Sequence, residues 1–217
     1  MTDLRQAREK MVRTQIAGRG ITDRAVLDAM RTVPRERFVK PDHDRFAYDD
    51  GPLPIGEGQT ISQPYVVALM IEAARLGPAD VVLEVGAGSG YAAAVMSRIA
   101  KRVYAIERHA TLGEAAAKRF EELGYDNIEL KVADGTRGWP EVAPFDAIIV
   151  SAGGPSAPPA LKDQLAIDGR LIIPVGPAQR SQRLIRITRT GATLFEQEDL
   201  GAVAFVPLIG EAGWSGA

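Results

Sequence analysis

The sequence contains no cysteine, and this absence removes several classes of chemistry at once. Without thiols the chain has no disulfide bonds, zinc–thiolate sites or iron–sulfur clusters, and no thiolate nucleophile. The two histidines, His43 and His109, lie too far apart in sequence to form a local metal motif. We therefore predict no metal site and expect both histidines to be exposed polar residues.

The chain also lacks a long apolar run and an excess of either charge. Runs such as Val66–Ile71 are far shorter than the roughly 18 residues that a membrane span needs. Residues 1–14 are rich in charge and contain no apolar stretch of a secretion signal, so we expect a cytoplasmic protein without a membrane partner. The 26 basic and 28 acidic side chains give a net charge of -2, which argues against a nucleic-acid partner.

The 217 residues, 46% apolar and 25% charged, are typical of one globular domain. From residue 81 onward, short apolar runs alternate with helical patterns. Strands are predicted over 81–85, 102–107, 128–132, 147–151 and 170–175, and helices over 91–100, 111–123 and 159–166. This alternation predicts an α/β fold with a doubly wound, mostly parallel sheet and helices on both faces.

The two ends of the chain break this alternation. Helical patterns over 3–17, 22–33 and 64–74 predict an N-terminal helical cap, and the proline- and glycine-rich residues 42–58 predict an ordered loop. Segments 183–188, 193–198 and 202–207 are predicted to be antiparallel strands at the edge of the sheet. We expect a single domain over 1–217, with the cap and active-site loop in 1–75, a cofactor-binding core in 76–177 and the edge strands in 178–217.

Two local signals mark the ends of the predicted helix over 111–123. Thr111 and Glu114 have the spacing of a capping box, in which the threonine side chain accepts a hydrogen bond from the first turn. Gly124 stands where a glycine often ends a helix in the left-handed conformation.

A glycine-rich turn directly follows the predicted strand over 81–85. Gly86, Gly88 and Gly90 alternate with other residues and lead into a helix, so a ligand can approach the main chain closely. Dinucleotide-binding turns have the spacing G-x-G-x-x-G, whereas this turn has G-x-G-x-G. The shorter spacing and the acidic Glu84 favour a ligand without phosphate and with an amine, a description that fits S-adenosylmethionine (AdoMet).

Two further acidic residues follow or end neighbouring strands. Glu107 ends the second strand of the core, where a carboxylate can accept hydrogen bonds from both ribose hydroxyls. Asp134, followed by Gly135, comes after the third strand and could receive the amino group of adenine. The carboxyl ends of parallel strands meet at one edge of the sheet, so we predict that these acids surround one nucleoside.

Residues 56–65 have the sequence Gly-Glu-Gly-Gln-Thr-Ile-Ser-Gln-Pro-Tyr. This segment resembles the signature G-x-G-Q-T-I-S-Q-P-Y of the protein-L-isoaspartate O-methyltransferase family, which belongs to the class I AdoMet-dependent methyltransferases. Residues 33–39, 144–150, 169–176 and 205–208 also resemble family segments, in the family's order and across almost the whole chain.

The resemblance implies methyl transfer from AdoMet to the free α-carboxylate of L-isoaspartyl residues in damaged proteins and peptides. The ester formed then closes spontaneously to a succinimide, which reopens partly to normal aspartate. The resemblance also implies that Ser62 is the catalytic residue, that Gln59, Thr60 and Ile61 cover the cofactor, and that Val206, Pro207 and Leu208 line the peptide cleft. We expect a monomer whose partners are isoaspartyl-containing substrates.

The chemistry is compatible with these residues. A carboxylate with a pKa near ~4 is ionised at pH 7, so the acceptor needs no general base. A neutral hydroxyl such as that of Ser62 can orient the acceptor without neutralising it. Ser62 also has a structural interpretation, because it precedes Pro64 closely and serine is common as a helix N-cap.

Three alternatives remain at this point. The first is an AdoMet-dependent methyltransferase for another small-molecule or protein carboxylate. The second is an NAD-dependent oxidoreductase, which would share the sheet and Glu107 but needs a different glycine spacing. The third is an AdoMet-binding protein without catalytic activity.

Overall fold

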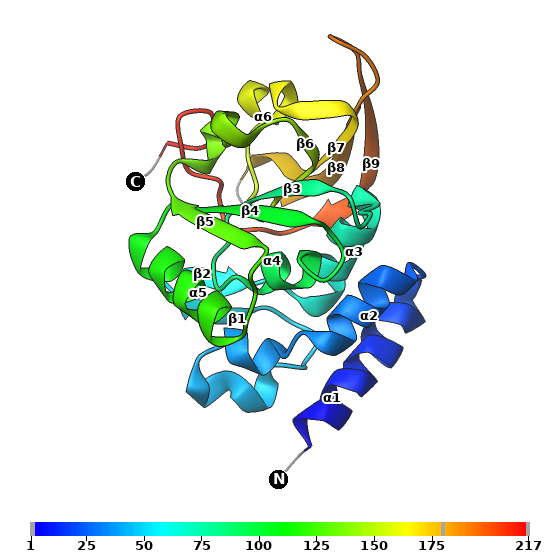
Figure 1. Ribbon diagram of the computed structural model, residues 1–217, viewed down its shortest axis with the longest axis vertical. Coiled ribbons are helices and arrows are strands. Elements are labelled where there is room, and N and C mark those ends of the chain that lie inside the picture. Colours follow the sequence, from blue (N-terminus) through cyan, green and yellow to red (C-terminus); the bar gives the residue numbers. More distant parts are fainter. Residues whose placement is uncertain (1–2, 179–180, 216–217) are drawn as a thin grey trace.

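The computed structural model describes residues 3–178 and 181–215 and contains a seven-stranded sheet in the order β5-β4-β3-β6-β7-β8-β9. Strands β3 to β7 are parallel, whereas β8 and β9 are antiparallel to their neighbours (Figure 1). In chain order, strands β3 to β9 are Val81–Val85, Arg102–Glu107, Ile128–Val132, Phe145–Val150, Leu165–Ala178, Ser181–Arg189 and Phe195–Val203. The predicted doubly wound, mostly parallel sheet with antiparallel edge strands is confirmed.

Helices cover both faces of the sheet. The α-helices α1 to α6 are Leu4–Lys10, Arg24–Thr32, Pro64–Ala74, Tyr91–Met96, Ala110–Glu122 and Pro159–Asp163. A π-helix (Met11–Ile16) continues α1, and short 3-10 helices occur at Ala17–Arg19, Arg35–Phe38, Pro41–Phe46, Gly135–Arg137 and Pro140–Val142. In Figure 1, α6 lies on one side of the sheet and the other labelled helices lie on the opposite side.

The alternation of side chains along each strand divides the core into two layers. Val82, Ala105 and Ile149 point to the side that carries α2, α3 and α4, whose buried residues belong to the same cluster. Leu83 and Ile148 point to the other side, where they pack with Leu161 of α6. No helix within the described residues is long and apolar enough to cross a membrane.

The order of the strands places a crevice at the centre of the sheet. From β3 the chain proceeds outward through β4 to β5, and then returns to place β6 on the other side of β3. β3 and β6 stay paired up to Val85 and Val150, but the segments that leave their carboxyl ends turn to opposite sides. In open α/β sheets ligands bind at such a reversal of strand order.

Several local predictions were wrong. The predicted loop 42–58 overlaps the 3-10 helix Pro41–Phe46 and includes β1 (Leu53–Gly56), which pairs with β2 (Gln59–Ile61) to form a hairpin. The segments 193–198 and 202–207 are not two strands: β9 is one strand that ends at Val203, and the chain then leaves the sheet. Gly124 does end α5 with a φ of +70°, as predicted.

The predicted capping box is also absent. The N-cap of α5 is His109, which makes no side-chain capping bond. The hydroxyl of Thr111 donates instead to Glu57 Oε1 of the hairpin, at 2.8 Å. The local pattern predicted the helix but not the partner of its first turn.

Candidate active site

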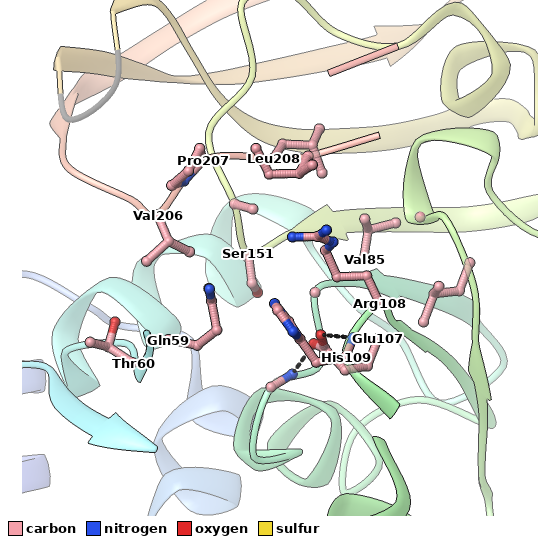
Figure 2. Close-up of a pocket in the computed structure, with 16 residues that line it drawn as sticks. Gln59, Thr60, Val85, Glu107, Arg108, His109, Ser151, Val206, Pro207 and Leu208 are labelled. Atoms are coloured by element: carbon pink, nitrogen blue, oxygen red, sulfur yellow. Dashed lines mark hydrogen bonds between the residues drawn. The ribbon is translucent and has the colours of Figure 1, made fainter. Parts of the chain in front are cut away.

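A cavity lies at the carboxyl ends of β3, β4 and β6, where the order of the strands reverses. It is lined by Gln59, Thr60, Val85, Gly86, Gly88, Ile106, Glu107, Arg108, His109, Gly135, Ser151, Ala152 and Val206–Ile209. Figure 2 shows Gln59, Ser151 and His109 around the same space, with Val206, Pro207 and Leu208 across from Glu107.

A second cavity adjoins the first at the glycine turn. It shares Thr60, Gly86, Gly88 and Ser151 with the first cavity and adds Ile61, Ser62 and Glu84. The two cavities together contain every residue of the predicted site except Gly90 and Asp134.

The glycine turn is held against the end of β4. The backbone N–H groups of Gly86 and Ala87 both donate to Ile106 O, at 2.8 and 3.1 Å. Gly88 has a φ of +54°, and a Cβ at this position would lie 3.1 Å from Ile55 Cδ1. A side chain at residue 88 would therefore be strained and crowded, whereas glycine leaves the main chain open to the cavity.

Gly90 serves the packing beneath the turn. Its φ is +88°, and a Cβ would lie 2.5 Å from Phe120 Cζ. The residue is the N-cap of α4 and lets this helix approach α5.

Glu107 is anchored by the backbone. Its Oε2 accepts from Gly88 N at 2.8 Å and its Oε1 accepts from His109 N at 2.9 Å, as the dashed lines in Figure 2 mark. The residue is 5% exposed and lines the first cavity. Each carboxylate oxygen has further acceptor capacity, so both can still receive hydroxyl groups of a ligand.

Glu84 is buried with one oxygen unused. Its Oε1 accepts from Ser151 Oγ at 3.3 Å, and Oε2 has no hydrogen-bond partner among the described residues. Burial raises the pKa of Glu84 to about 8, and the nearby charge of Glu107 acts in the same direction. The Ser151 hydroxyl and the Ala93 backbone amide act to lower the pKa but do not offset burial.

The hairpin β1–β2 forms one wall of the site and presents Gln59, Thr60 and Ile61. Its tip is fastened to the start of α5 through Glu57, whose Oε1 accepts from Thr111 Oγ1 at 2.8 Å. Glu57 Oε2 also lies 3.9 Å from His109 Nδ1. A carboxylate at a helix N-terminus interacts favourably with the helix dipole.

Ser62 lines the second cavity, between β2 and α3. The N-cap of α3 is Gln63, and this helix has no side-chain capping bond. The structural interpretation of Ser62 as an N-cap is therefore wrong. The backbone of Ser62 is fixed instead by Arg35, whose Nη2 donates to Ser62 O at 2.8 Å.

Arg35 is fully buried, at 0% exposure, and links the backbone at Ser62 to the backbone at Ala47. Its Nε donates to Ala47 O at 2.8 Å, and its guanidinium carbon lies 4.8 Å from the centroid of the Tyr91 ring. Burial lowers the pKa of Arg35 to about 10, so the side chain remains a cation at pH 7.

The segment Val206–Leu208 closes the opposite wall. The Gly153 N–H donates to Val206 O, and the Leu208 N–H donates to Gly153 O, both at 2.8 Å. The segment thus pairs with the chain that leaves β6, and it lines the first cavity.

Asp134 lies beside the cavity but is occupied by other groups. Its Oδ1 accepts from Thr136 N at 2.9 Å and from Thr136 Oγ1 at 2.7 Å, and its Oδ2 accepts from Glu211 N at 2.9 Å. Partial burial acts to raise the pKa of Asp134, but these bonds hold it below its usual range. Asp134 caps the 3-10 helix Gly135–Arg137 and fastens the C-terminal segment, and only its neighbour Gly135 reaches the cavity.

Sequence reasoning missed Arg108, His109 and Ser151. His109 was expected to be exposed, but its side chain is 23% exposed and lines the cavity, and its Nε2 is buried without a partner among the described residues. The signal was their position, because Ser151 directly follows β6 and the other two directly follow β4. Residues just beyond strand ends in such sheets face the ligand.

This arrangement suits a nucleoside that carries a cationic amine. The unpartnered Glu84 Oε2 can accept from an ammonium group, and Glu107 can accept from ribose hydroxyls. The open main chain at Gly88 leaves room for the body of the ligand. The residues therefore fit AdoMet.

Comparisons with known proteins agree with the geometry. The family model for protein-L-isoaspartate(D-aspartate) O-methyltransferase matches residues 6–213. A protein-L-isoaspartate O-methyltransferase of Methylorubrum extorquens is 60% identical over 97% of this chain and 92% of its own length. That of Brucella anthropi is 55% identical over 99% of this chain and 98% of its own.

Solved structures agree as well. One described as a protein-L-isoaspartate O-methyltransferase has a TM-score of 0.85 at 31% identity, over 95% of this chain and 67% of that one. A Plasmodium falciparum structure described as the same type of enzyme, in complex with S-adenosyl-L-homocysteine, has a TM-score of 0.81 at 28% identity, over 93% and 98% of the two chains. The NAD-dependent alternative is not favoured, and the chain belongs to the protein-L-isoaspartate(D-aspartate) O-methyltransferase family, whose cofactor is AdoMet.

Proposed function

We propose that this enzyme transfers the methyl group of AdoMet to the α-carboxylate of L-isoaspartyl residues in damaged proteins and peptides. The observation that carries this proposal is the position of Ser62. Ser62 lines the cavity that is also lined by Glu84 and the glycine turn, and it does not cap α3. It rests on a backbone fixed by the buried Arg35.

When bound, AdoMet supplies an activated methyl group on a sulfonium centre. Glu84 would hold the ammonium group of the cofactor and Glu107 would hold its ribose hydroxyls, and the hairpin residues Gln59, Thr60 and Ile61 would exclude water from one side. Ser62 would donate a hydrogen bond to the acceptor carboxylate and so orient that carboxylate for methyl transfer. The acceptor is already ionised at pH 7, so no side chain has to remove a proton.

The hydroxyl of Ser62 is better suited to this role than a cation. The negative charge of the acceptor disappears in the transition state, so a strong ion pair would stabilise the ground state and slow transfer. A neutral donor orients the carboxylate with less of this effect, and positioning supplies most of the rate. Val206, Pro207 and Leu208 hold the peptide that carries the acceptor.

The finer aspects of the proposal follow from the sequence. We propose a single catalytic domain that acts as a monomer in the cytoplasm and needs neither a nucleic acid nor a membrane. The near balance of 26 basic and 28 acidic side chains supports the absence of a nucleic-acid partner.

The test is methyl transfer from radiolabelled AdoMet to an isoaspartyl peptide, with the matching aspartyl peptide as control. A base-labile label on the isoaspartyl peptide alone is the expected result. Label on neither peptide, with label on another carboxylic acid, would support a different acceptor and overturn the proposal.

Replacing Ser62 by alanine tests the role of the hydroxyl. We expect kcat to fall by about 10- to 100-fold, because the acceptor carboxylate loses the contact that orients it for methyl transfer. The Kd of S-adenosylhomocysteine and the melting temperature should stay near wild type, because Ser62 does not cap α3.

Ser97→Ala is the control, since Ser97 is buried and donates to Ala94 O at 2.7 Å, away from both cavities. It should lower the melting temperature and leave kcat unchanged. Normal turnover by the Ser62 variant would show that the hydroxyl does not act on the acceptor.

A further inference from the structure

The chain leaves the edge strand β9 shortly before it reaches the segment Val206–Leu208, which lines the first cavity. The pair Gln182↔Val203 is the last pair between β8 and β9. Beyond it the chain crosses to the end of β6, where Pro207 forms an isolated bridge with Gly153. Between Val203 and Pro207 the backbone therefore has no strand beside it.

The side chain of Gln182 takes the place of the missing strand. Gln182 is 3% exposed. Its Oε1 accepts from Phe205 N at 2.8 Å, and its Nε2 donates to Phe205 O at 3.4 Å. The side-chain amide thus satisfies both polar backbone groups of one buried residue, which would otherwise be left without partners.

Gly153 is shaped to accept this amide. A Cβ at residue 153 would lie 2.5 Å from Gln182 Nε2, so glycine is required for the amide to lie where it does. The same glycine donates to Val206 O and accepts from Leu208 N, both at 2.8 Å. Gln182, Gly153 and Phe205 therefore form one unit that fixes the start of the segment Val206–Leu208.

We propose that Gln182 is a positioning residue that sets the affinity of the enzyme for its peptide acceptor. It does not line the cavity and acts through Phe205 and Gly153 on the segment Val206–Leu208, which does line it. This inference rests on the proposed function, because it takes that segment to be the wall that holds the peptide.

Two substitutions separate positioning from stability. Gln182→Met removes both hydrogen bonds and keeps a buried chain of similar length. We expect the KM for the isoaspartyl peptide to rise by about five- to tenfold. The kcat at saturating peptide and the Kd of S-adenosylhomocysteine should stay within about twofold of wild type. The reason is that Phe205 makes its side-chain-mediated hydrogen bonds with Gln182 and not with Glu84 or Ser62.

Gln182→Glu adds a pH-dependent readout. A protonated carboxyl can accept from Phe205 N and donate its O–H to Phe205 O, whereas the ionised form repels that carbonyl oxygen. Burial favours the protonated form. The peptide KM of this variant should therefore approach wild type at pH 6 and rise by pH 8, relative to wild type at each pH. The peptide should carry an acetylated N-terminus and no histidine, so that it does not titrate in this range.

Gln164 provides a matched control. It is 9% exposed, and its amide also holds two backbone groups: Oε1 accepts from Trp139 N at 2.7 Å and Nε2 donates to Arg137 O at 2.8 Å. Gln164→Met should lower the melting temperature but leave the peptide KM within about twofold. An equal rise in KM in both methionine variants would show a general loss of structure and overturn the role of Gln182.

The outcomes distinguish this inference from the proposed function. Wild-type protein that methylates no isoaspartyl peptide overturns the proposed function and the acceptor role of the segment. Active wild-type protein with an unchanged KM in Gln182→Met overturns the role of Gln182 alone. If Gln182→Met fails to fold, the comparison of Gln182→Glu at pH 6 and pH 8 decides, and a KM ratio to wild type that does not change with pH overturns the role.

Discussion

Replacing Glu84 by glutamine should stabilise the ligand-free enzyme and weaken its binding of AdoMet. Burial raises the pKa of Glu84 from 4.5 to about 8. Between these values the folded protein retains a proton that the unfolded chain has lost, so the free energy of unfolding falls as pH rises. Each pH unit contributes up to about 1.4 kcal/mol, and the whole interval at most about 5 kcal/mol. Glutamine has the same shape and carries no charge at any pH, so the variant avoids this loss.

Urea unfolding of both proteins without ligand, at pH 5, 6, 7, 8 and 9, measures the effect. The difference in free energy of unfolding, variant minus wild type, should increase by about 2–4 kcal/mol between pH 5 and 8 and then level off. Glu129→Gln serves as the control, because Glu129 is a half-exposed carboxylate that pairs with Arg102 at 2.8 Å. A difference for the Glu84 variant that stays constant with pH would refute the reasoning.

Ligand binding should release the proton that Glu84 carries in the ligand-free enzyme. At pH 7 a group with a pKa near 8 is about nine-tenths protonated, so pairing with the ligand ammonium should release about 0.9 proton. Calorimetry of S-adenosylhomocysteine binding in buffers of different ionisation enthalpy measures this release. We expect about 0.9 proton for the wild type and close to none for Glu84→Gln, together with a higher Kd. Equal release by both proteins would show that Glu84 is not the group that ionises.

Two further predictions concern the packing beneath the glycine turn and the hairpin wall of the site. Gly90→Ala should lower the free energy of unfolding more than Gly124→Ala, measured in urea. Both residues have a positive φ, which costs about 1–2 kcal/mol in alanine, but only at Gly90 would the new Cβ meet the Phe120 ring, at 2.5 Å; equal losses would show that the ring moves aside freely. Thr111→Val should make S-adenosylhomocysteine dissociate about two- to fivefold faster in stopped-flow measurements, because the hairpin loses a bond of about 0.5–1 kcal/mol. Thr14→Val, which removes an exposed bond to Lys10 O in the first helical segment, is the control, and identical dissociation rates in the two variants would contradict this role of Glu57.

Elements that depend on local signals were predictable from the sequence. The strands β3, β4 and β5 have the predicted bounds, because short β-branched apolar runs are flanked by turn residues. The bounds of α3 also agree, since Pro64 fixes the first turn. The glycine turn and Glu107 could be placed because each immediately follows or ends such a strand.

Features that depend on partners distant in sequence were not predictable. Thr111 has the spacing of a cap but bonds to Glu57, which is 54 residues away in sequence. The hairpin β1–β2 was not predicted, because its segment is rich in prolines and glycines, which are typical of loops. The position of His109 just beyond β4 carried a signal that was not used, whereas Ser151 was hidden because the predicted strand 147–151 included it and β6 ends at Val150.

Glu84, Glu107 and Asp134 show that a position near a strand end does not by itself determine what an acidic residue binds. Each follows or lies near a strand end, but their uses differ with the donors that the fold places around them. Asp134 is held by Thr136 and Glu211, Glu107 is held by two backbone N–H groups, and Glu84 keeps one oxygen without a partner in residues 3–178 and 181–215.

This difference determines what kind of ligand the site favours. Burial, together with the charge of the buried Glu107, raises the pKa of Glu84. Without a cation beside it, Glu84 avoids repulsion from Glu107 by keeping its proton at pH 7, whereas a cation favours the ionised carboxylate. A cationic amine can therefore take the place of that proton, and this preference arises from the oxygen of Glu84 that has no partner among the described residues rather than from the number of acids at the strand ends.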